Sequence, residues 1–268
     1  MDRKRLLEMA GNPEFIPGIY NYCDRWCERC AFTRRCLNYA TMQQSSFPEG
    51  SEITDENVFQ SVKESFDLTF ELLEDMAKEQ GIDLDQVVQG AELPDRSEKR
   101  KEAEQNPAAQ AGYEYSNIVR TWFEQHAALF EEKGKKLENE MLLGIGDPES
   151  ALADMMDASE VIRWHQYQIY VKMMRALTGM EDEEEMPELW EEYQRDSDGS
   201  AKVALIGIDR SITAWETLQT VLGDESGGIR KIIDRLSKWR TSLEQIFPRA
   251  RTFVRPGFDR ESESGGSR

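Results

Sequence analysis

The sequence lacks long apolar runs. No stretch approaches the about 18 consecutive apolar residues that a membrane-spanning helix needs. The basic residues at positions 3–5 are not followed by the hydrophobic core of an export signal. We therefore expect a cytoplasmic protein that has no membrane partner.

Positive charge is also scarce. The chain has 33 Lys and Arg residues against 52 Asp and Glu residues, which gives a net charge of −19. Binding of nucleic acid depends on clustered basic side chains that neutralise phosphates, so this balance disfavours a nucleic-acid partner. The expected partner is an unidentified protein or redox partner.

The pattern of a β-sheet is missing as well. No alternating run of β-branched residues lies between turn signals. Apolar residues instead recur every three or four positions, and each such segment ends near Gly or Pro. The segments are 55–80, 107–144, 148–179, 201–223 and 229–247. They predict an all-α fold, an antiparallel helical bundle of about five long helices, with EDEEE (181–185) and DSDGS (196–200) in loops and a short helix near Leu189 and Trp190.

The first 50 residues differ from the rest of the chain. They hold seven Lys and Arg residues against six Asp and Glu residues, which leaves 26 against 46 for the remainder. Pro and Gly interrupt them, and no long amphipathic repeat runs through them. We predict a small, irregular, cysteine-rich metal-binding lobe over 1–50, a helical bundle domain over 51–258, and a disordered tail over 259–268.

Cysteine is absent outside a short segment, in which Cys23, Cys27, Cys30 and Cys36 lie within fourteen positions. Disulfides are one interpretation, although a reducing cytoplasm disfavours them. Zinc is the second, but structural zinc sites usually take two ligand pairs from separated knuckles. An iron–sulfur cluster is the third, because the irons of a cubane each take one thiolate over a body larger than one ion. We favour a [4Fe–4S] cluster on these cysteines, with zinc as the alternative.

The cysteine spacing is similar to that of two iron–sulfur families. Cys27, Cys30 and Cys36 match the C-x2-C-x5-C part of the cluster loop of endonuclease III-like DNA glycosylases, and Cys23, Cys27 and Cys30 match the C-x3-C-x2-C spacing of radical SAM enzymes. The glycosylase pattern places six residues before its second cysteine where this chain has three. Radical SAM enzymes are α/β barrels, unlike this helical pattern. The resemblance therefore implies cluster ligation alone, without DNA repair or radical chemistry.

Basic and aromatic residues surround the cysteines. They are Arg25, Arg29, Arg34, Arg35, Tyr20, Tyr22, Trp26 and Phe32. Positive charge offsets an anionic metal–thiolate centre, and aromatic rings limit its exposure to water. The same residues also suit an alternative role, in which they anchor a small lobe to an acidic bundle. A second basic and aromatic stretch, FPRARTFVRPGF (247–258), packs on either the lobe or the bundle, and the sequence does not decide which.

The chain has only two histidines, His126 and His165, and both lie on apolar helix faces. A carboxylate-bridged di-iron site needs Glu-x-x-His on two helices, whereas the required positions hold Phe123 and Ile162. We expect both histidines to be packed side chains. A helical-bundle enzyme that uses His126 or His165 with buried acids stays as a further alternative, so the sequence leaves open whether the protein is an enzyme.

Full ligation by four cysteines would leave no iron open to a substrate. Electron transfer, redox sensing or a structural role therefore rank above direct catalysis. The alternative hypothesis, from another functional class, is a non-enzymatic helical protein that binds other proteins and whose N-terminal lobe is held together by zinc.

Overall fold

The structure, a computed structural model, describes residues 3–45, 54–84, 86, 96–185, 194–223 and 227–259. Within these residues every regular element is an α-helix or a short 3-10 helix, and none is a strand. The predicted all-α fold is therefore confirmed. No helix in the described part of the chain has both the length and the apolar character needed to cross a membrane. The short helix expected near Leu189 and Trp190 and the tail from Arg260 lie outside the described residues.

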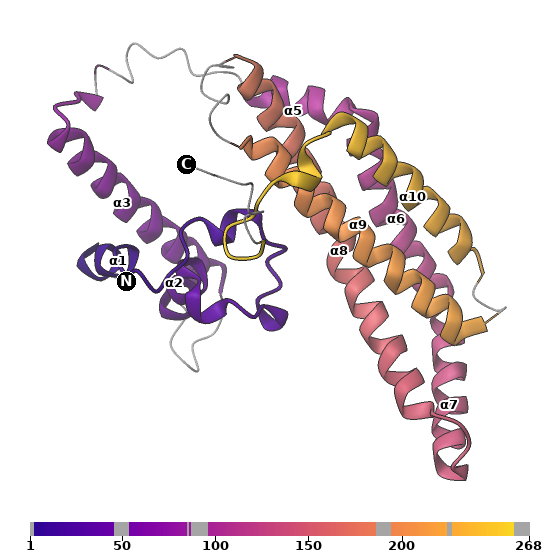
Figure 1. Cartoon of the computed structure of the whole chain (residues 1–268). Coiled ribbons are helices and arrows are strands. Elements are labelled where there is room, and N and C mark those ends of the chain that lie inside the picture. Colours follow the sequence, from indigo (N-terminus) through magenta and orange to yellow (C-terminus); the bar gives the residue numbers. More distant parts are fainter. Residues whose placement is uncertain are drawn as a thin grey trace, which may run out of the picture. The chain divides into compact units, whose positions relative to one another are not determined.

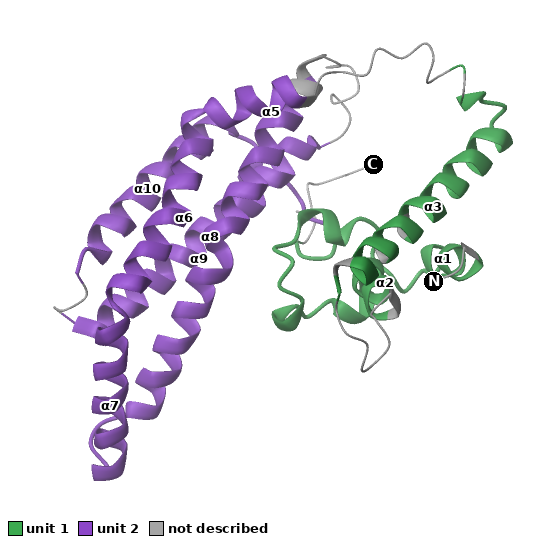
Figure 2. Cartoon of the chain, turned by 180° about the vertical axis from the view of Figure 1, so that it is seen from behind, with its two compact units in different colours: residues 1–95, 256–260 green, residues 96–255, 261–268 purple. Residues whose placement is uncertain are grey.

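The chain divides into two compact units (Figure 2). Unit 1 comprises residues 1–95 and 256–260, and unit 2 comprises residues 96–255 and 261–268. Unit 1 contains helices α1 (Arg3–Ala10), α2 (Leu37–Ser45) and α3 (Asp55–Glu79). Residues 256–260 thus belong with the cysteine-bearing N-terminal residues, although they are distant in sequence. The predicted division at residue 50 stays a prediction.

Unit 2 is a helical bundle (Figure 1). Its elements are α5 (Arg96–Gln105), α6 (Pro107–Gln125), α7 (Ala127–Leu143), α8 (Pro148–Glu185), α9 (Asp196–Leu222), α10 (Ile229–Ile246) and the 3-10 turn η6 (Ala250–Thr252). Helices α8 and α9 form the most extensive packed pair, α6 packs on α8, and α10 packs on α9. The predicted helical bundle is confirmed in these elements.

Helix α9 lies at the centre of the core of unit 2. The Trp215 side chain is fully buried, and its indole Nε1 donates a hydrogen bond to the Tyr115 hydroxyl over 3.1 Å. Burial raises the pKa of Tyr115 to about 12. Helices α8 and α9 approach closely at Gly207, where a Cβ atom would lie 2.9 Å from Cγ1 of Ile169. This close approach explains why a glycine is accommodated inside a long buried helix.

The prediction of a single helix over 107–144 is wrong in one respect, because the structure has two helices there. His126 ends α6 and precedes α7, with φ −107° and ψ 13°. Its ring stacks on Trp122 at 4.4 Å between centroids, and Nδ1 lies 2.7 Å from the Trp122 carbonyl oxygen. These contacts stabilise the break. Because the apolar spacing continues through it without Gly or Pro, periodicity alone does not reveal it.

The two acidic segments predicted as loops are helical. Helix α8 continues through Gly179 to Glu185, so EDEEE forms its last turn, and DSDGS forms the start of α9. The buried Glu183 carboxylate accepts hydrogen bonds from the Ser197 backbone N–H (2.9 Å) and hydroxyl (2.5 Å). A negative charge at the N-terminus of a helix satisfies its free N–H groups. Glu183 therefore stabilises the start of α9.

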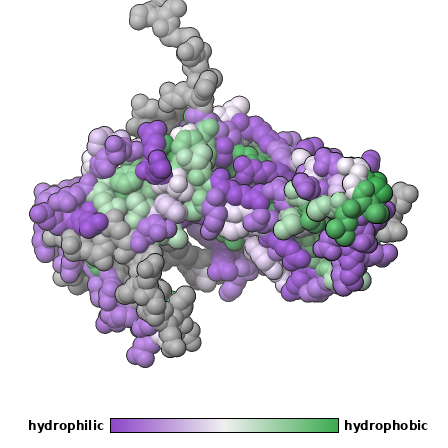
Figure 3. Space-filling model, turned by 90° about the horizontal axis from the view of Figure 1, so that it is seen from below, coloured by the Kyte–Doolittle hydropathy of each residue, from purple (hydrophilic) through white to green (hydrophobic). Residues whose placement is uncertain are grey.

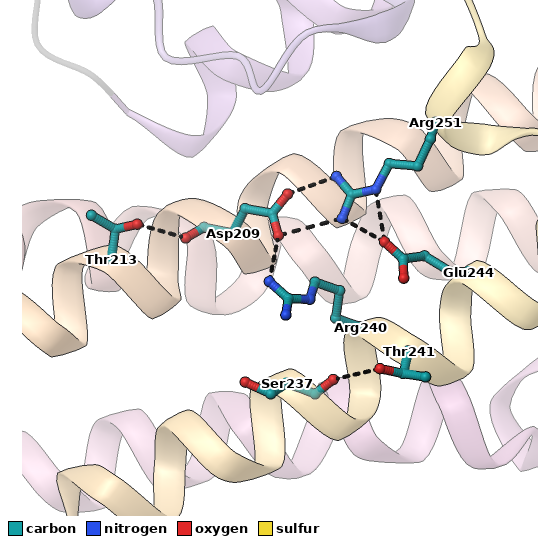
Figure 4. A network of polar contacts seen from close by, with 7 residues as sticks. All are labelled: Asp209, Thr213, Ser237, Arg240, Thr241, Glu244 and Arg251. Carbon is teal, nitrogen blue, oxygen red and sulfur yellow. Dashed lines mark hydrogen bonds and ion pairs between the residues drawn. The ribbon is translucent and has the colours of Figure 1, made fainter.

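The stretch after α10 is held on the bundle up to residue 254. Arg251 of η6 contacts Asp209 of α9 at 2.6 Å and Glu244 of α10 at 2.8 Å, and Arg240 also reaches Asp209 (Figure 4). The Lys202 ammonium donates to the Phe253 carbonyl oxygen. These contacts join α9, α10 and η6, so the first part of FPRARTFVRPGF packs on unit 2.

Helix α3 was predicted from its periodicity, and the helix is confirmed. Its N-cap is Thr54, whose hydroxyl accepts from the Asn57 backbone N–H over 3.3 Å. Its apolar stripe is exposed, including Phe59 (71%), Phe66 (60%) and Phe70 (62%). The face drawn in Figure 3 also shows apolar patches at the surface. Thus α3 is a helix of unit 1 with an exposed apolar face.

Candidate metal centre

The cysteines lie at the ends of three short turns. These turns are η1 (Ile19–Tyr22), η2 (Cys27–Arg29) and η3 (Thr33–Arg35). Cys23 directly follows η1, Cys27 begins η2, Cys30 ends η2, and Cys36 ends η3. The Cys30 backbone N–H donates to the Cys27 carbonyl (3.2 Å), and that of Cys36 donates to the Thr33 carbonyl (3.3 Å). These short turns, each closed by i→i+3 hydrogen bonds, keep the cysteine segment compact.

All four cysteines line one cavity, and the structure therefore brings together every predicted ligand. The thiols are half-buried and form no disulfide. The space that remains between the lining residues is about 20 Å³, close to what one water-sized particle occupies. No three His, Cys, Asp or Glu side chains among the described residues are arranged closely enough to hold a metal ion. The thiols thus share a cavity but are not packed around a single point.

Burial and nearby groups disfavour the thiolate form of Cys27. The pKa of Cys27 is raised, first by its burial and then by the nearby Cys23, Cys30, Cys36 and Glu28. All three other thiols are therefore close enough to act on Cys27. A bound metal cation would offset this effect, because its positive charge stabilises the deprotonated form of the thiols that coordinate it.

Trp26 is a structural element of the cysteine segment. It is 5% exposed, and its backbone N–H donates to Asp24 Oδ1 over 3.1 Å. The Arg29 guanidinium lies over its ring at 4.1 Å from the centroid, which is a cation–π contact. The preceding residue, Arg25, has φ 59°, in the left-handed region that non-glycine residues rarely adopt. This strained residue turns the chain between Cys23 and Cys27.

The segment of residues 14–16 is attached to the cysteine segment. The Arg35 guanidinium donates to the Glu14 carbonyl over 3.2 Å, and the Ile16 N–H donates to the Arg35 carbonyl over 3.0 Å. Arg25, Arg29, Arg34 and Arg35 are all exposed. They therefore place positive charge on the surface around the thiols, as the sequence suggested.

A short C-terminal segment, residues 256–258, contributes Phe258 to the wall of the cavity, and we call this segment the strap. Phe258 lines the cavity together with the cysteines, and its ring meets Phe32 edge-to-face at 5.0 Å between centroids. Gly257 has φ 76°, and a Cβ there would lie 2.8 Å from Ile16 Cδ1 and 2.9 Å from Ile19 Cδ1. Only glycine fits both this backbone conformation and this space.

The contact of the strap with the cysteine cavity could not be placed from the sequence. The undecided stretch 247–258 in fact divides, since residues 247–255 belong to unit 2 and residues 256–258 to unit 1. The only local signal was the Pro-Gly-Phe sequence after a basic segment. Nothing in that sequence indicates that residues 256–258 contact the N-terminal residues of unit 1.

The two histidines do not join the cysteines. His126 stacks on Trp122 at the end of α6, and His165 is buried in α8, where a Cβ at Gly207 would lie 3.2 Å from its Nδ1. Both belong to unit 2. Their surroundings are those of packed side chains.

We predict that His126→Gln or His165→Gln leaves the metal content unchanged. Each change should lower the unfolding free energy by about 1–3 kcal/mol, because it disturbs a packed polar group. Metal analysis beside thermal unfolding measures both effects. Loss of about one metal equivalent with all four cysteines intact would instead support a second metal site on the histidines.

Comparison with known proteins gives no relative. No protein-family model, no curated protein and no solved structure matches this chain. The function proposed below therefore depends on the geometry and chemistry of the cysteine cavity.

Proposed function

We propose that unit 1 binds a [4Fe–4S] cluster through Cys23, Cys27, Cys30 and Cys36. The observation that carries this proposal is the convergence of thiols from three successive turns on one cavity. A cubane distributes its four thiolates over a larger body than a single metal ion does.

The surrounding residues suit an anionic iron–sulfur centre. The Phe32 backbone N–H donates to the Cys30 sulfur over 3.4 Å, and such bonds to sulfur tune the potential of a bound cluster. Trp26, Phe32 and Phe258 supply aromatic walls that limit access of water. The exposed arginines offset negative charge at the rim. These features favour a cluster that gains and loses an electron while it is shielded from water.

When bound, a cluster of this type supplies one-electron redox chemistry. With a cysteine for each iron, no iron remains open to a substrate, so electron transfer or redox sensing is the favoured role. The centre also links the three turns and the strap, which adds a structural role. No residue of the lobe is assigned to direct catalysis.

Anaerobic reconstitution of the full chain with iron and sulfide tests this proposal. We expect about four irons and four sulfides per chain and a brown colour that bleaches on reduction with dithionite. Zinc supplied in excess should not displace the assembled cluster. A colourless protein that keeps neither iron nor sulfide would contradict the proposal.

Zinc is the second candidate, and one observation favours it. The space between the lining residues, about 20 Å³, is close to that of a single small particle. A zinc site would need the four thiols to approach until each lies about 2.3 Å from one ion. In that case the protein as isolated should carry about one zinc per chain, and the role of the site would be to staple unit 1.

A further inference from the structure

A second cavity lies in unit 2 between α6 and α10, far in sequence from the cysteines. The two helices lie side by side in opposite directions (Figures 1 and 2). At one end Trp122 Nε1 donates to the Gly227 carbonyl over 2.9 Å, and further along α6 a Cβ at Gly112 would lie 3.0 Å from the ring of Trp239. The groove between them has a volume of about 440 Å³, which lies in the range of small-molecule sites.

The groove is long and mostly apolar. Its lining on α6 runs from Pro107 to Ile118, which corresponds to about 16 Å at the rise of an α-helix. Its main apolar walls are Ala108, Ala111, Ile118, Ile232, Leu236 and Trp239. On α6 the lining includes the small residues Ala108 and Ala111, and on α10 it includes the larger Ile232, Leu236 and Trp239.

One lining residue has an unused polar atom. Trp239 is 6% exposed, and its indole Nε1 is buried with no hydrogen-bond partner in the described part of the protein. Buried indole N–H groups usually have an acceptor. This atom has no accessible surface, so it does not face the open groove, and the ligand proposed below does not depend on it.

The charged side chains at the mouth of the groove form no ion pair with any described residue. Arg235 and Lys238 on α10 and Glu114 on α6 line it and are exposed, and the described residues offer none of them an ion pair. Their neighbours on α10 differ, since Arg230 pairs with Asp234 and Arg240 with Asp209. The mouth thus has a net charge of about +1 on a strongly acidic protein, which favours an anion there.

We propose that this groove binds a small amphipathic carboxylate, with its aliphatic chain along the apolar walls and its carboxylate at Arg235 and Lys238. This inference is independent of the metal centre. Arg235 supplies the fork of donors that suits a carboxylate, and the apolar walls gain free energy by excluding water from the chain. Glu114 opposes the anion and limits its affinity.

Calorimetric titration with dodecanoate, kept below its micelle concentration, tests the proposal on the full chain. We expect saturable binding at one site per chain, about ten-fold or more weaker in the double variant R235Q/K238Q. Glu114→Gln should tighten binding, because it removes repulsion. The matched control R230Q/K231Q removes the same charge from α10 outside the groove and should bind as the wild type does.

A variant that fills the groove distinguishes binding in the groove from binding to other apolar surfaces. Ala111→Leu fills the groove and should abolish the saturable phase, whereas any weak binding to exposed surfaces such as α3 should persist. Dodecanol, which lacks the charge, should bind about ten-fold or more weakly than dodecanoate. Absence of saturable binding, or equal affinities in the wild type, R235Q/K238Q and R230Q/K231Q, would overturn the proposal. The charge variants change exposed positions, so the test remains decisive if Ala111→Leu fails to fold.

Discussion

Replacing any one of the four cysteines by Ser is expected to abolish the metal centre and loosen the cysteine-bearing part of unit 1. The apparent binding free energy of a structural metal site, about 10–16 kcal/mol for zinc in small domains, is largely folding free energy. Residues 3–45 have few buried apolar side chains, chiefly Ile19 and Trp26, so little else holds them together. Unit 2 keeps its own core around Trp215 and should stay helical.

Metal analysis, limited proteolysis and circular dichroism measure this result on Cys27→Ser. The matched control is Gln43→Ser, an exposed position on α2, which should keep its metal. We expect rapid cleavage within residues 3–45 of the cysteine variant and a largely unchanged helical signal. Full metal retention in any single cysteine variant would show that the residue is not a ligand.

The second large effect is expected at the strap. Gly257→Val should displace residues 256–258 from the cysteine cavity, because the new side chain meets Ile16 and Ile19 and the backbone has φ 76°. The left-handed conformation alone costs a residue with a Cβ about 1–2 kcal/mol. Loss of Phe258 then exposes one wall of the centre to water. We expect the bound metal to be lost to a chelator about ten-fold faster or more.

Gly81→Val is the matched control for the strap. Gly81 has φ 69° and no atom within 4 Å of an added Cβ, so it carries the same backbone penalty without the clash. Phe258→Ala removes the aromatic wall and leaves the strap backbone unchanged. Equal rates of metal loss in Gly257→Val, Phe258→Ala and Gly81→Val would show that the strap does not protect the centre.

Helices α6, α8, α9 and α10 were predictable because their apolar residues follow a 3.6-residue period and end near recognisable signals, whereas α5 (Arg96–Gln105) lies outside the predicted segments. Gly223 and Gly228 bound α9 and α10 as expected. The break at His126 was not predictable, because stacking on Trp122 rather than Gly or Pro stabilises it. The start of α9 was missed for a related reason. A tertiary hydrogen bond from Ser197 to Glu183 makes an acidic, glycine-containing segment helical.

The grouping of the four cysteines at one cavity was predictable, and the full lining of that cavity was not. Close sequence spacing brought Cys23, Cys27, Cys30 and Cys36 together, and local turns account for that. Phe258 reaches the same cavity from more than 200 positions away in the sequence. Similarly, periodicity predicted α3 but not the exposure of Phe59 and Phe66, since a period defines an apolar face without defining what packs on it.

The central claim is that one four-iron cluster is held by the four cysteines of unit 1. The Mössbauer spectrum of full-length protein, anaerobically reconstituted with isotopically enriched iron, tests it most directly. We expect the signature of a cubane in which iron pairs share valence electrons, with about four irons per chain. A spectrum of isolated tetrathiolate-bound iron, or protein without bound iron, would contradict it.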